Sequence, residues 1–155
     1  MKIKKKWIIV IASAIILVLG IGAFIYFKNQ PYVFTKPEYI KEVVVQNENF
    51  NDLLDEFLDQ VSSYNGTVDS TKKLEETSNR FTLFVSGMET KLKPRVPAEA
   101  KDHYNKMMDA YKIYLDAIAL YKRAVPKNPS TERNDLLNQA KSKLEEAQIA
   151  MKELK

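Results

Sequence analysis

The chain has no cysteine and only one histidine, His103, among its 155 residues. Without cysteine it can form no disulfide framework, no thiolate metal site and no cysteine nucleophile. A single imidazole also excludes histidine-rich metal sites, and the sequence has no Glu-x-x-His pair of the kind that binds two metals in helical bundles. We therefore expect no metal site, no cofactor and no catalytic residues, and we predict that the protein is not an enzyme.

Glycine is scarce too, and two of the four glycines, Gly20 and Gly22, fall in an apolar N-terminal segment. This leaves no glycine-rich loop that could hold a phosphate. The net charge of +4 comes from the lysines around that segment, because residues 29–155 hold 19 Lys and Arg against 20 Asp and Glu, a net charge of −1. We therefore expect no nucleic-acid partner.

The apolar segment extends from Trp7 to Phe27, 21 residues without a charge. At about 1.5 Å per residue, a helix of this length spans roughly the 30 Å of a bilayer's hydrocarbon core. Four lysines precede the segment and one follows it, so the positive-inside rule places the N-terminus in the cytoplasm. We predict a cytoplasmic basic tail at residues 1–6 and an uncleaved signal anchor at residues 7–27, which crosses the cell membrane once.

A cleaved signal peptide is the alternative, because its basic and apolar regions have a similar sequence. A weak small-x-small site is present at Gly20-Ile21-Gly22, but the apolar residues continue beyond it. Cleavage there would give a secreted soluble protein in place of an anchored one.

The rest of the chain predicts an all-α fold. Residues 28–35 form a linker that contains Pro31, and residues 36–155 form an extracytoplasmic bundle. Proline, glycine and capping residues divide it into four amphipathic helices. Their expected ranges are about 36–65, 69–93, 97–125 and 131–155. Short connections favour an antiparallel up-down four-helix bundle with coiled-coil-like seams, and a three-helix core with a loose fourth helix is the alternative.

The third predicted helix has the most regular apolar pattern, with steps of four and three residues. Its members are Ala100, Tyr104, Met107, Tyr111, Tyr114, Ile118, Tyr121 and Val125. On the first helix the pattern predicts a seam through Ile40, Val43, Phe50, Leu54, Phe57, Val61 and Tyr64, with Asn47 filling the gap. Asn47 either fixes the register of the bundle or marks a solvated, frayed part of the helix, and its polar neighbours favour the second interpretation.

Two groups of residues are candidates for binding. The first is the tyrosine stripe, which we define as Tyr104, Tyr111, Tyr114 and Tyr121. Aromatic stripes at helical spacing usually belong to a core, but they also suit an amphipathic groove for a partner. The second group is Lys91, Lys93 and Arg95, which would contact lipid headgroups if their loop faces the membrane. For His103 we expect a solvated side chain near a helix N-terminus.

The sequence thus predicts a small membrane-anchored protein that acts outside the cytoplasm by binding or scaffolding an envelope protein. The architecture is similar in style to small anchored proteins of Gram-positive bacteria. An accessory sensory or ligand-binding module that works through a partner membrane protein is the alternative, because the six-residue tail has no room for an output domain.

Overall fold

The computed structural model describes residues 31–154, nearly all of which belong to one compact unit, residues 33–155. The predicted tail and anchor, residues 1–27, lie outside the described residues. Within residues 31–154, none of the helices has an apolar stretch long enough to span a bilayer.

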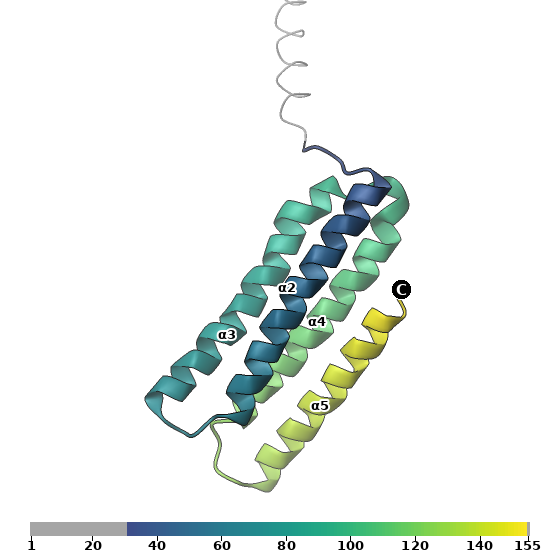
Figure 1. Ribbon diagram of the computed structural model, residues 1–155. Coiled ribbons are helices and arrows are strands. Elements are labelled where there is room, and N and C mark those ends of the chain that lie inside the picture. The colour runs from purple at the N-terminus through teal and green to yellow at the C-terminus, as the bar shows by residue number, and fades with distance from the viewer. Residues whose placement is uncertain (1–30, 155) are drawn as a thin grey trace, which may run out of the picture. The chain divides into compact units, whose positions relative to one another are not determined.

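The described residues are all-helical, and their four long helices form a bundle, as predicted. Figure 1 shows these helices side by side, each running in the opposite direction to the one before it. Their bounds are Lys36–Ser62 for α2, Val68–Gly87 for α3, Lys101–Ala124 for α4 and Thr131–Lys152 for α5.

Side-chain caps set where three of the helices begin. Thr35 and Glu38 form a capping box at the start of α2, and Ser130 accepts a hydrogen bond from the Arg133 backbone N–H at the start of α5. Helix α3 begins at Val68, one residue before the predicted start at 69, because Thr67 is the N-cap.

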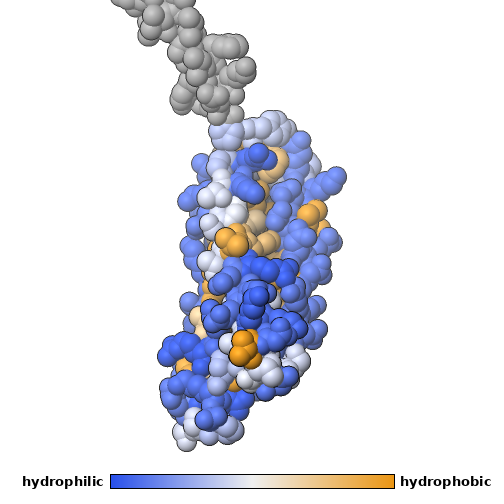
Figure 2. Space-filling view, turned by 90° about the vertical axis from the view of Figure 1, so that its left-hand side faces the viewer, coloured by the Kyte–Doolittle hydropathy of each residue, from blue (hydrophilic) through white to orange (hydrophobic). Residues whose placement is uncertain are grey.

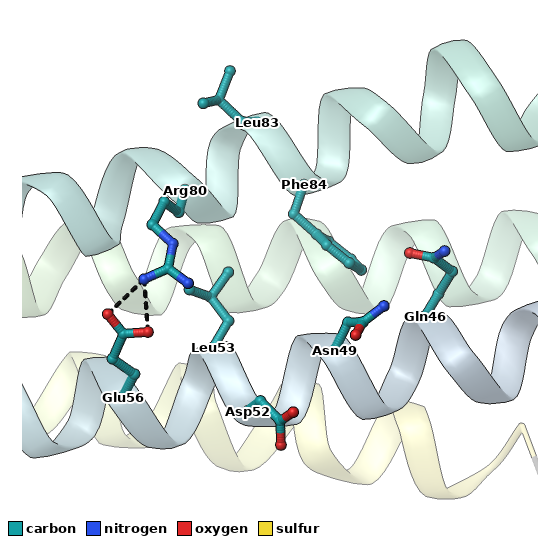
Figure 3. A pocket seen from close by; sticks show the side chains of 8 residues that line it. All are labelled: Gln46, Asn49, Asp52, Leu53, Glu56, Arg80, Leu83 and Phe84. Carbon is teal, nitrogen blue, oxygen red and sulfur yellow. Dashed lines mark hydrogen bonds and ion pairs between the residues drawn. The ribbon is translucent and has the colours of Figure 1, made fainter.

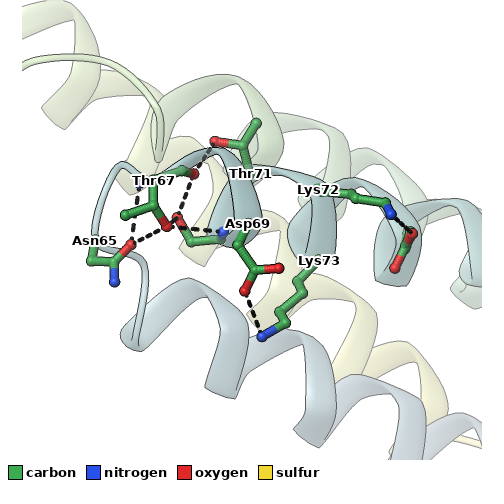
Figure 4. A network of polar contacts seen from close by, with 8 residues as sticks. Asn65, Thr67, Asp69, Thr71, Lys72 and Lys73 are labelled. Carbon is green, nitrogen blue, oxygen red and sulfur yellow. Dashed lines mark hydrogen bonds and ion pairs between the residues drawn. The ribbon is translucent and has the colours of Figure 1, made fainter.

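The α2–α3 turn explains this shift (Figure 4). Gly66 adopts a left-handed conformation with φ 79°, which glycine tolerates best. Asn65 Oδ1 then accepts hydrogen bonds from the Thr67 backbone N–H and hydroxyl at 3.2 and 2.8 Å. The Thr67 hydroxyl oxygen in turn accepts from the Ser70 N–H at 3.2 Å, so the helix begins directly after Thr67.

The connection between α3 and α4 contains the proline-rich break that the sequence predicts. It starts as a π-helical turn at Met88–Leu92 and continues through 3₁₀ turns at Lys93–Arg95 and Ala98–Ala100. Pro94 has no N–H to donate, and its ring would clash with the carbonyl four residues earlier in an α-helix. The wider turn ends with the Lys93 N–H bonded to Met88 O.

Aromatic rings fill the centre of the bundle. Phe50 of α2 has its ring centroid 4.6 Å from that of Tyr111, 4.8 Å from that of Tyr114 and 5.4 Å from that of Phe81. These contacts join α2, α3 and α4 around one fully buried ring. We call Phe50, Phe81, Tyr111 and Tyr114 the aromatic cluster.

Alanines join α5 to α4, and this pair of helices packs more closely than any other pair in the unit. On α4 the buried alanines are spaced by seven residues, at Ala110, Ala117 and Ala124, and on α5 they are Ala140 and Ala147. Small side chains at heptad spacing let two helices approach closely along one face. The fourth helix is therefore part of the bundle.

The seam of α2 is shifted at its first turn relative to the prediction. Ile40 is 51% exposed, and Tyr39 is buried in its place. Farther along the predicted seam Val43, Phe50, Leu54 and Phe57 are buried, whereas Asn47, Val61 and Tyr64 are half-buried.

Candidate functional site

The tyrosine stripe lies in the core of the bundle, where all four side chains are at most 7% exposed. The Tyr104 hydroxyl donates to Met88 O at 3.1 Å, which gives this carbonyl of the π-helical turn a second donor. The Tyr111 hydroxyl donates to Asn47 Oδ1 at 2.5 Å. Burial raises the pKa of the Tyr111 phenol, and it raises that of Tyr104 to about 12, with a smaller contribution from the charge of Glu89.

The pairing with Tyr111 gives Asn47 a clear role. The helix is continuous through Asn47, which is half-buried and links α2 to α4 through its side chain. The interpretation of this region as frayed is therefore wrong. A polar side chain at a seam position can fix the alignment of neighbouring helices, and Asn47 has the contact needed for this.

His103 also has a partner on α2, contrary to our expectation of a solvated side chain. Its Nδ1 lies 2.9 Å from the Tyr39 hydroxyl, and the ring is half-buried. The two rings meet edge to face, with centroids 5.8 Å apart. The contact therefore links α2 to α4. Among residues 31–154 no cluster of three or more His, Cys, Asp or Glu is arranged to hold a metal ion.

The basic residues Lys91, Lys93 and Arg95 are all exposed on the α3–α4 connection. Arg95 anchors the segment that leads into α2: its carbonyl accepts a hydrogen bond from the Phe34 N–H at 2.8 Å. Its guanidinium carbon lies 5.8 Å from the centroid of the Phe34 ring, in cation–π range. The three basic residues thus lie at the end of the helical unit at which α2 begins.

A first surface hollow, of about 590 Å³, lies between α2 and α3; we call it the α2–α3 face. Figure 3 shows Leu53 and Phe84 at its base, with polar side chains of α2 along one side. Arg80 Nη1 closes one end by binding Glu56 Oε1 and Oε2 at 2.5 and 2.6 Å. On the α3 side of the unit, Figure 2 shows apolar side chains as separate areas in a mostly hydrophilic surface.

Leu83 stands out on this face because it is 71% exposed. It also borders a smaller hollow beside the π-helical turn, and both hollows include Gln46 and Phe84. An exposed leucine near a half-buried ring and a polar border resembles the layout of protein interfaces.

A third and larger hollow, of about 1280 Å³, lies between α2 and α5, and residues of α4 also line it. We call it the α2–α5 groove. Tyr114 is the one member of the tyrosine stripe that lines it. The groove exists because α5 packs chiefly on α4 and leaves α2 without a close neighbour on that side. Its apolar lining includes Ile40, Val43, Val44, Met107, Met151 and Leu154.

Sequence reasoning predicted none of the three hollows. It also missed the alanine face of α4, although Ala110, Ala117 and Ala124 are spaced by seven residues. That spacing could have indicated a second packing face on α4. If α5 packs on that face, it leaves one side of α2 uncovered, which is where the groove lies. The partners of Asn47 and His103 each lie 64 residues away in the sequence, so no local spacing indicated them.

The comparisons with known proteins add no family to these observations. No protein-family model, curated protein sequence or solved structure matches the chain. The geometry of the described residues is therefore the basis on which a function can be argued.

Proposed function

We propose that the protein is a small single-pass membrane protein that displays a non-catalytic helical binding module outside the cytoplasm, where it binds or scaffolds a protein of the cell envelope. Residues 7–27 act as the anchor and residues 1–6 as the cytoplasmic tail. The proposal is supported by the sequence order: 21 uncharged apolar residues are followed, after a short linker, by a compact helical unit.

The observation that carries the binding role is the α2–α3 face. Leu83 exposes 71% of its surface, and burying a leucine side chain is worth about 1.5–3 kcal/mol. The Glu56–Arg80 ion pair lines the same face, so it can serve as a polar border. A partner helix with an apolar side chain toward Leu83 and polar side chains toward Arg80 would fit this surface.

Topology is the first test. A periplasmic-type reporter enzyme fused after Lys155 of the full chain should be active, and a cytoplasmic-type reporter at the same place should be inactive. The mature protein should begin at Met1 and remain with the membrane after a high-salt wash. Intact protein in the culture medium that begins near Ala23 would contradict the anchor and establish a secreted bundle.

Partner binding is the second test. A photo-crosslinking amino acid at Leu83 of the full chain should give a discrete protein adduct in living cells. The same amino acid at Ile149 is the control, because Ile149 is an apolar residue of α5 that is 58% exposed and lines none of the hollows described above. Equal adducts at both positions, or none at Leu83, would refute a binding role for the α2–α3 face.

A further inference from the structure

The exposed residues of α2 that line the α2–α5 groove are mainly apolar near the start of the helix and polar farther along it. At the apolar end Ile40 and Val44 are 51% and 50% exposed and lie one helical turn apart on α2. Met151 and Leu154 line the same end from the C-terminal part of the chain. Farther along α2 the buried side chains of Phe50 and Leu54 continue the lining, and exposed polar residues, Glu48, Asn51 and Asp55, border it.

Charge follows the same division. Lys36, the first residue of α2, and Lys152, the last residue of α5, both line the apolar end, together with one acid, Glu99. The acids Glu48 and Asp55 line the polar half. An anionic group would therefore be attracted to the end at which α2 begins.

We infer that the α2–α5 groove holds one acyl chain of an anionic membrane lipid, with the headgroup beside Lys36 and Lys152. The inference rests on the proposed anchor, because that anchor keeps the apolar end of the groove near a bilayer. The eight linker residues, 28–35, span at most about 28 Å when fully extended, so Lys36, at the start of the groove, stays within roughly that distance of the anchor's end.

The dimensions favour a long flexible chain over other occupants. The lining of the groove extends along α2 from Lys36 to Asp55, about 28 Å at 1.5 Å per residue, which suits an extended hydrocarbon chain. A partner helix would need apolar anchors over several turns, but on α2 the exposed apolar lining is limited to Ile40 and Val44. Two half-exposed side chains also supply little of the roughly 800 Å² per subunit that a stable dimer buries.

The test uses the full chain in phosphatidylcholine vesicles with a small amount of phosphatidylglycerol whose acyl chain ends in a photoreactive diazirine. After illumination, mass spectrometry identifies the labelled residues. We expect adducts within residues 7–27, from lipid around the anchor, and a second group at Ile40, Val44, Met151 and Leu154, which line the groove and are exposed or half-buried. The same probe with a phosphocholine headgroup should label the anchor equally and the groove less.

Two neighbouring valines provide a matched pair of variants. Val44 lines the groove, whereas Val45, 42% exposed on the same helix, does not. Val44→Asp should lower the groove adducts about fivefold or more relative to the anchor adducts of the same molecules, because a carboxylate is costly to bury against a hydrocarbon chain. Val45→Asp should leave this ratio unchanged.

The two groups of adducts separate this inference from the proposed function. Labelling of residues 7–27 without labelling of the groove overturns the lipid site and is consistent with the anchor. In that case the groove would be tested for a protein partner. Groove labelling without anchor labelling refutes the anchor alone. Equal effects of Val44→Asp and Val45→Asp, or equal groove labelling by the two headgroups, overturns the assignment of an anionic lipid to this groove.

Discussion

Tyr111 and Tyr121 are both buried tyrosines of α4, but only Tyr111 has a hydrogen-bond partner among the described residues, namely Asn47 Oδ1. Replacing Tyr111 with phenylalanine keeps the ring and leaves this half-buried amide oxygen without its donor. We expect Tyr111→Phe to lower the free energy of unfolding by about 1–3 kcal/mol, and Tyr121→Phe to lower it by less. Urea unfolding followed by circular dichroism measures both, and equal losses would refute the role assigned to the Asn47 contact.

The same pair of residues shows what the sequence could not provide at this scale. The burial of Tyr111 was predictable, because its position in an unbroken four-three pattern fixes the face of the helix. Its hydrogen bond was not, because the partner belongs to another helix 64 residues away. The polar neighbours of Asn47 favoured a solvated segment, and only the position of α4 shows that its side chain turns inward.

At the scale of the element, the alanines between α4 and α5 make a specific prediction. Ala117 is fully buried at this interface, whereas Ala119 is exposed on the same helix. Ala117→Leu adds a large side chain where two helices already approach closely, and we expect a loss of about 1–3 kcal/mol in unfolding free energy.

Ala119→Leu is the control for this change, because both variants introduce the same residue into α4. We expect it to shift the melting temperature little, since leucine and alanine both favour helix and the site is solvated. Equal melting temperatures for the two variants would contradict a close contact between α4 and α5 at Ala117.

Element boundaries were largely predictable because proline, glycine and capping residues mark them. The start of α2 and the start of α5 after Ser130 agree with the structure. The second helix was predicted to run to residue 93, but α3 ends at Gly87 and the chain continues as a π-helical turn. The first turn of α2 was assigned incorrectly, because Tyr39 and Ile40 are adjacent apolar residues and either fits a seam. The contact of Tyr39 with His103 decides between them, and this contact depends on where α4 lies.

At the scale of the whole molecule, the buried tyrosines should make the free energy of unfolding decrease at alkaline pH. Burial raises the pKa of Tyr39 and Tyr104 from 10.0 to about 12. Because a phenol is neutral when protonated, the unfolded chain loses these protons from about pH 10, while the folded unit keeps them until about pH 12. Their stabilising effect is therefore complete below pH 10 and is lost as the pH rises from 10 to 12.

We expect the urea midpoint of the unit to fall over this interval. Tyr104→Phe removes one titrating group, so the fall with pH should be shallower in that variant than in the wild-type protein. An identical slope in the two proteins would contradict the raised pKa of Tyr104. Comparing slopes separates this effect from the ionisation of exposed lysines, which both proteins share.

The aromatic cluster around Phe50 also determines the near-ultraviolet circular dichroism of the protein. The one tryptophan of the chain, Trp7, precedes the helical unit, so the unit absorbs in the near ultraviolet only through tyrosine and phenylalanine. Rings held at fixed angles in a chiral core, such as Phe50 and Tyr111, acquire optical activity that free rings lack. The near-ultraviolet dichroism of tyrosine therefore reports the order of the bundle's core, while indole emission reports the surroundings of Trp7, and one sample reveals both without an added dye.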